Sequence, residues 1–153
     1  MSVSKKIATF GEAMVEFFDT GDNCWRRGFA GDSLNVAWAL RALLPNSCTV
    51  DYVTRIGVDG VSSDLLQFLE ESSLGTGGIS RDSHRTLGLY TIKTDPQGER
   101  SFDYWRSHSA ARCLADDPQQ LLQSLKGSDW LYLSGISAAI VEAQGRSNLL
   151  DVL

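Results

Sequence analysis

Short apolar runs alternate with longer amphipathic segments along much of the chain. Three of these runs are short enough to be buried strands: 7–10, 49–56 and 130–133. Three longer segments have the length and apolar spacing typical of helices: 33–44, 61–72 and 119–126. Because strands that alternate with helices form parallel βαβ units, we predict an α/β fold with a three-layer core. A final helix is predicted from about Val141.

Two other segments, 14–30 and 86–106, alternate like strands and have no helix between their halves. In the second segment, residues 95–98 read Asp-Pro-Gln-Gly, which is a type I turn sequence followed by a glycine suited to a three-residue hairpin loop. That loop gives three facing pairs on one side of the ribbon: Ile92 with Phe102, Tyr90 with Tyr104, and Gly88 with Arg106. We predict that the two segments form a small antiparallel β lid that projects from the core.

The start of the helix 33–44 is a candidate binding site. A turn at Ala30-Gly31 leads into this helix, and Asp32 or Ser33 is predicted to cap it. The helix is apolar on nearly every side, so we expect it to be buried, with Asn35 as a polar residue in its first turn. An amide beside a glycine turn and a positive helix end suits a polyhydroxylated or anionic small molecule. The alternative is a core helix in which Asn35 only satisfies backbone groups.

The predicted lid carries a second set of candidate residues. Tyr90, Tyr104 and Arg106 share one face of the ribbon, with Gly88 opposite Arg106 leaving room for a ligand. A guanidinium pairs bidentately with a carboxylate, so this face suits a sugar acid. The alternative is packing across a dimer interface, because the lid segments are rich in large aromatic residues: Phe17, Phe18, Trp25, Phe29, Phe102 and Trp105.

Charge and cysteine content limit the partners to be expected. A formal net charge of −5 argues against nucleic acid or an anionic membrane surface. No apolar run approaches the roughly 18 residues of a membrane span, and residues 1–6 lack a signal-peptide core. Three cysteines, Cys24, Cys48 and Cys113, are widely spaced and match no metal-ligand pattern, so we expect free thiols, a cytoplasmic location and no metal site.

Several stretches, found in order between about Lys6 and Ile140, carry a resemblance to a known family. Besides residues 26–37, they are Gly11-Glu12-Ala13-Met14-Val15-Glu16, Gly57-Val58-Asp59, Tyr104-Trp105-Arg106 and Leu131-Tyr132-Leu133-Ser134-Gly135-Ile136-Ser137. They resemble the ribokinase-like (PfkB) carbohydrate kinases. In detail they look like the branch that phosphorylates a sugar acid, 2-keto-3-deoxygluconate, to its 6-phosphate.

The resemblance implies a Rossmann-like core, a β lid through which the protein forms a homo-oligomer, and ATP and Mg²⁺ as cofactors. It implies that substrate is bound by residues from several parts of the chain: Gly31, Asn35, Tyr90, Tyr104, Arg106 and Ile136. The turn departs from the family at Ala30, where a second glycine is typical.

A larger departure concerns the family's C-terminal half. The Gly-Ala-Gly-Asp motif, which in the family accompanies the catalytic aspartate and most of the ATP site, does not occur here. We therefore interpret residues 1–153 as the N-terminal part of one kinase domain, with no catalytic residue of its own and with ATP and Mg²⁺ bound by the other half. Two alternatives stay open: a kinase for a neutral sugar such as fructose or ribose, and a non-catalytic fragment that dimerises through its lid.

Overall fold

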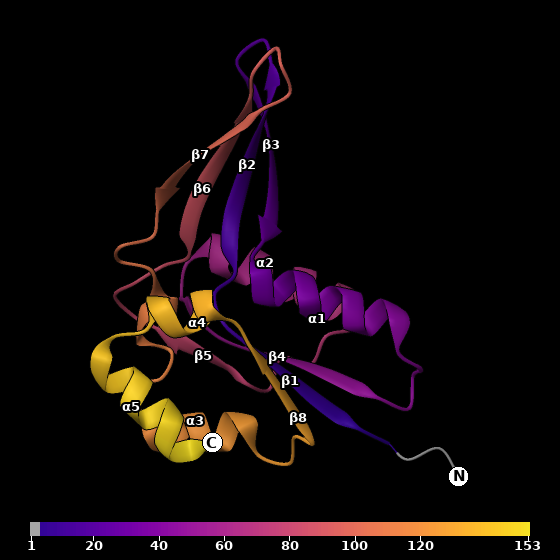
Figure 1. Cartoon of the computed structure of the whole chain (residues 1–153), viewed down its shortest axis with the longest axis vertical. Helices are drawn as coiled ribbons and strands as arrows, with labels where there is room; N and C mark the ends of the chain where they lie inside the picture. The colour runs from indigo at the N-terminus through magenta and orange to yellow at the C-terminus, as the bar shows by residue number, and fades with distance from the viewer. Residues whose placement is uncertain (1–3) are drawn as a thin grey trace.

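The core of the protein is a four-stranded parallel sheet with the strand order β5-β4-β1-β8 (Figure 1). The computed structural model describes residues 4–153. The core strands are β1 (Lys6–Phe10), β4 (Thr49–Gly57), β5 (Ile79–Asp82) and β8 (Trp130–Leu133). The predicted parallel α/β core is therefore confirmed, and it also contains β5, a strand that the sequence pattern did not predict.

Helices cover both faces of this sheet. One face packs against α1 (Asp32–Leu43) and α2 (Gly60–Glu71). The other face packs against the short helix η1 (Ala110–Cys113), α3 (Pro118–Leu125), α4 (Gly135–Ile140) and α5 (Ala143–Val152). Alternate residues of β4 point to opposite faces, so Tyr52 and Ile56 join the first apolar cluster and Val53 joins the second. These layers confirm the predicted three-layer architecture.

The lid is a second four-stranded sheet with the order β3-β2-β6-β7, and it projects from the core in Figure 1. Its strands are β2 (Met14–Gly21), β3 (Cys24–Ala30), β6 (Gly88–Thr94) and β7 (Arg100–Trp105). Two antiparallel hairpins meet along β2 and β6, which pair in parallel. The predicted antiparallel pairing is found within each hairpin, and it is wrong at this junction. Along the chain, β2 follows β1 and β6 follows β5. Because β1 and β5 run parallel in the core sheet, both hairpins leave the core at the same edge.

The 86–106 hairpin has the predicted register. Tyr90 pairs with Tyr104, and Ile92 pairs with Phe102. In the loop, Asp95 N–H donates to the carbonyl of Glu99 at 2.9 Å, and Gly98 N–H donates to the carbonyl of Asp95 at 3.0 Å. Gly98 has a φ of 88°, the left-handed conformation that the loop requires.

Helix α1 differs from its prediction in two respects. Gly31 occupies the capping position and no side chain caps the helix, because Asp32 lies inside its first turn and the Ser33 hydroxyl bonds Tyr52 Oη at 3.1 Å instead. The helix is also only partly buried. It packs on the sheet through Ser33, Leu34 and Ala37, while apolar residues on its other side, such as Trp38, face solvent.

The C-terminal part of the core contains a short helix, α4, directly after β8. The helix begins at Gly135, and Ser134 caps it by accepting a hydrogen bond from Ser137 N–H at 3.0 Å. The preceding strand, β8, is less buried than predicted, because it forms an edge of the sheet and Trp130 is exposed.

Candidate functional site

A cavity of about 220 Å³ lies where the lid meets the carboxyl edge of the core sheet. All the residues expected to bind substrate line this one cavity: Gly31, Asn35, Tyr90, Tyr104, Arg106 and Ile136. They come from the start of α1, from β6, from the end of β7 and from α4. The structure adds Glu12, Met14, Asp32 and Phe102 to the lining. Residues far apart in the sequence thus meet at the edge where open α/β sheets usually bind ligands.

The lid side of the cavity is an aromatic wall. The rings of Tyr90 and Tyr104 stack with their centroids 5.5 Å apart, and Phe102 lies 6.3 Å from Tyr104. The Tyr90 hydroxyl donates a hydrogen bond to Glu16, its partner across the β2–β6 junction. Burial, and then this carboxylate, raise the pKa of Tyr90, so its phenol is neutral at physiological pH. The wall therefore combines flat apolar faces with hydroxyl groups, a combination that suits a sugar.

Arg106 supplies the positive charge of the cavity, and the negative charge of Glu12 lies next to it. The guanidinium forms an ion pair with the Glu12 carboxylate and lies 5.9 Å from the Tyr104 ring centroid. Glu12 is 3% exposed, so its carboxylate is almost entirely removed from solvent. Burial raises the pKa of Glu12, while Ser109, Arg106 and Arg112 act in the opposite direction.

Sequence reasoning overlooked Glu12, although the Gly11-Glu12 pair that follows the first strand is part of the family resemblance. The available signal was its position. An acidic residue directly after a buried parallel strand lies at the ligand-binding edge of the sheet. Its partner Arg106 is distant in the sequence, so no local pattern could have paired the two residues.

Two glycines make room for this arrangement. A Cβ atom added at Gly31 would lie 2.3 Å from the carbonyl oxygen of Glu12. A Cβ atom at Gly88 would lie 2.7 Å from Glu12 Oε1 and 3.1 Å from the Arg106 Cβ. The prediction that Gly88 faces Arg106 is therefore confirmed, and the glycine also accommodates Glu12.

The core side of the cavity is open and polar. Asn35 is exposed, not buried as expected, because the first turn of α1 faces the cavity. The free N–H groups of this turn are capped by no side chain, so the positive end of the helix remains available to a ligand. Ile136, at the start of α4, adds an exposed apolar contact.

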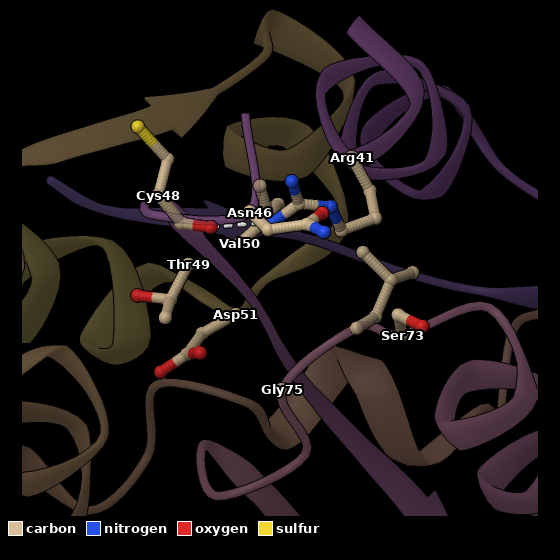
Figure 2. A pocket seen from close by; sticks show the side chains of 9 residues that line it. Arg41, Asn46, Cys48, Thr49, Val50, Asp51, Ser73 and Gly75 are labelled. Atoms are coloured by element: carbon tan, nitrogen blue, oxygen red, sulfur yellow. Dashed lines mark hydrogen bonds between the residues drawn. The ribbon is translucent and has the colours of Figure 1, made fainter. Parts of the chain in front are cut away.

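A larger cavity, of about 470 Å³, lies at the amino end of β4, and its lining side chains are drawn in Figure 2. Arg41 points into it, but its guanidinium already donates to the carbonyl groups of Cys48, Leu44 and Pro45. Asp51, on the same rim, pairs with Lys6 at 3.0 Å. Because its charged groups are engaged in the fold, this cavity offers less for ligand recognition than the one below the lid.

Residues 4–153 contain no group of three or more His, Cys, Asp or Glu residues that could hold a metal ion. Cys24, Cys48 and Cys113 are free thiols. Among the described residues, no helix is long and apolar enough to cross a membrane.

Comparisons with known proteins agree with this fold. The chain is 40% identical to 2-dehydro-3-deoxygluconokinase from Escherichia coli K12 over 99% of its own length and 50% of that protein. The crystal structure of 2-dehydro-3-deoxygluconokinase from Thermotoga maritima superposes over 97% of this chain and 46% of that one, with a TM-score of 0.81 and 21% identity, and so supports the fold. A fructokinase from Xylella fastidiosa with bound ATP covers 71% of this chain and 33% of that one, with a TM-score of 0.62 and 29% identity.

The chain spans about half the length of the curated relatives that it matches. The model of the pfkB family carbohydrate kinases matches residues 4–150, almost the whole chain. The fold and the family match thus agree, and the chain belongs to the pfkB family of carbohydrate kinases.

Proposed function

We propose that this chain forms the sugar-binding side of an ATP-dependent kinase that phosphorylates 2-keto-3-deoxygluconate to its 6-phosphate. One observation carries the proposal: the candidate substrate residues line a single cavity, in which Arg106 is the one cation among the described lining residues. A cation at the wall of a sugar-sized cavity favours a sugar acid over a neutral sugar. The relatives named 2-dehydro-3-deoxygluconokinase also favour a sugar acid as the substrate.

Each part of the cavity has a role in this proposal. Arg106 pairs with the substrate carboxylate, and Tyr90 and Tyr104 contact the carbon chain and a hydroxyl. Gly31 and Asn35 contact the remaining hydroxyl groups at the positive end of α1. Ile136 covers the core side of the ligand. In this arrangement the chain binds and orients the sugar, which is a large part of what a kinase must do.

ATP supplies the phosphoryl group, and we propose that it binds with Mg²⁺ in the C-terminal half that the relatives possess. The residues described here contain no cluster of three or more His, Cys, Asp or Glu side chains that could hold the metal. We expect the 153-residue chain alone to transfer no phosphate. We propose that the complete enzyme consists of this chain and a C-terminal half of that kind. Substrate binding can be tested in this complete enzyme.

A neutral-sugar kinase of the same family is the second candidate. The ion pair with Glu12 already neutralises Arg106, which weakens the argument from charge. The likeness to a fructokinase is in keeping with this candidate. The two candidates differ in one respect that can be measured, the contribution of Arg106 to substrate binding.

We also propose that the lid is a self-association surface and that the protein is cytoplasmic. Trp25, Phe102 and Trp105 are exposed on the lid, and clustered exposed aromatics often form interfaces. The free cysteines suit a reducing compartment.

Replacing Arg106 in the complete enzyme tests the substrate. Arg106→Ala should raise the KM for 2-keto-3-deoxygluconate about ten- to a hundred-fold, because a charge-assisted bidentate contact contributes roughly 1.5–3 kcal/mol. Arg106→Lys should recover part of the loss, since an ammonium cannot form the fork. The KM for ATP should stay unchanged.

Arg27→Ala is the matched control. Arg27 lies on the lid strand β3, forms a 2.9 Å ion pair with Asp64 and does not line the cavity. Its replacement should leave the kinetics unchanged. If Arg106→Ala behaves like this control and fructose or ribose is the better substrate, the neutral-sugar candidate replaces the sugar acid.

A further inference from the structure

The position of Glu12 raises a question of charge balance. Its carboxylate is buried beside Arg106, and it forms the ion pair through Nη2 of the guanidinium that faces the cavity. Under the proposed function, the substrate brings a second carboxylate to the same guanidinium. Two carboxylates at one cation in a buried site repel each other, and the less solvated one tends to take up a proton.

Among the described residues, no second positive charge is in ion-pair contact with Glu12. Arg112, from η1, acts on Glu12 only at longer range and already pairs with Glu142. Asp32, from α1, is another carboxylate at the cavity. From β4, the buried Tyr52 hydroxyl bonds Ser33, and burial keeps its phenol neutral by raising its pKa. Arg106, beyond the end of β7, is therefore the one cation in contact with Glu12 among the described residues.

We propose that Glu12 is a proton-linked positioning residue: its carboxylate holds Arg106 in the empty cavity, and it takes one proton from solvent when the carboxylate of a sugar acid pairs with Arg106. This inference rests on the proposed function, because it needs an anionic substrate. The net charge of the cluster is zero before binding, with Glu12 and Arg106 ionised. It is zero again afterwards, with the substrate and Arg106 ionised and Glu12 neutral.

The surroundings of Glu12 favour this exchange. Burial penalises its charged form and already raises its pKa in the empty cavity, so protonating it needs less free energy than protonating an exposed glutamate. This proton uptake makes binding depend on pH. At a pH above the pKa of free Glu12, each tenfold fall in proton concentration should weaken sugar-acid binding by up to about tenfold. A neutral sugar adds no carboxylate and should bind without proton uptake.

Calorimetry on the complete enzyme tests the proposal. The probe, 2-keto-3-deoxygluconate, is titrated at one pH in two buffers whose ionisation enthalpies differ. Wild type should take up about one proton per bound ligand. Glu12→Gln mimics the protonated state, so it should bind the probe without proton uptake and with an affinity that does not change with pH. At high pH this variant should bind more tightly than wild type.

Asp64→Asn is the control, because Asp64 is an exposed carboxylate that does not line the cavity. It should keep the proton uptake of wild type. If wild type binds the probe with no proton uptake, or if Glu12→Gln binds weakly at every pH, Glu12 has only a structural role and the proposal is wrong. If Glu12→Gln fails to fold, the two-buffer measurement on wild type decides by itself. If wild type binds fructose or ribose but not the probe, the proposed function fails, and this inference fails with it.

Discussion

Strands β4 and β7 show how differently the two sheets of this protein are stabilised. β4 lies inside the core sheet with helices on both sides, and Tyr52, Val53 and Ile56 are completely buried. β7 is the outer strand of the lid, and all of its residues are exposed. Packing on both faces fixes β4, whereas hydrogen bonds to β6 and aromatic contacts fix β7. The core therefore provides stability, and the lid leaves side chains such as Tyr104 exposed.

The largest difference between the two strands should appear in the free energy of unfolding when one side chain on each strand is truncated to alanine. Ile56→Ala removes a side chain that is 0% exposed and should lower the free energy of unfolding by about 2–5 kcal/mol. Phe102→Ala removes one that is 46% exposed and should lower it by less than about 1 kcal/mol. Chemical denaturation of both variants measures the difference. Equal losses would mean that the lid and the core are one stability unit.

The junction between lid and core should show an intermediate effect. Gly88→Ala places a Cβ against Glu12 and Arg106 and should destabilise the protein by about 1–3 kcal/mol, with weaker substrate binding. Gly28→Ala is the control, because a Cβ at Gly28 on the lid strand β3 meets no atom within 4 Å. Thermal unfolding and a binding titration compare the two. An unchanged Gly88→Ala variant would show that the side chains at the junction move aside easily.

Self-association through the lid should give the smallest effect. Trp105 on the lid is 60% exposed and Trp38 on α1 is 58% exposed, so the two tryptophans are similar in all but location. Trp105→Ala should weaken dimerisation by about 1 kcal/mol, roughly fivefold, and Trp38→Ala should not. Sedimentation at several concentrations measures this. A wild-type monomer at tens of micromolar would remove the lid interface from the proposal.

The sequence predicted the parts of the structure that depend on local patterns. The turn at residues 95–98 and the two-residue period of the strands fix the hairpin register, so Tyr90 and Tyr104 were paired correctly. The family resemblance, combined with this register, predicted that the candidate residues form one site. Helix α1 was misjudged because an apolar composition does not reveal which side packs on the sheet, and Trp38 faces solvent.

Other features depend on contacts between distant segments. The parallel pairing of β2 with β6 follows from where β1 and β5 end in the core, which a pattern within either hairpin does not contain. Glu12 and Arg106 meet for the same reason. The short strand β5 pairs only with β4 at the sheet edge, and its four residues are too few to give a clear period.

The position of β1 between β4 and β8 also determines when the core can be completed during synthesis. β1 pairs with β4 on one side and with β8 on the other, and Lys6 N–H donates to Asp129 Oδ2 at 2.8 Å across 123 positions of sequence. At usual elongation rates, roughly 4–15 s pass between the synthesis of β4 and that of β8. Throughout this interval one edge of β1 is unpaired, and unpaired apolar edges recruit other chains. The nascent protein therefore has a period of several seconds in which a ribosome-bound chaperone would have a defined edge to protect.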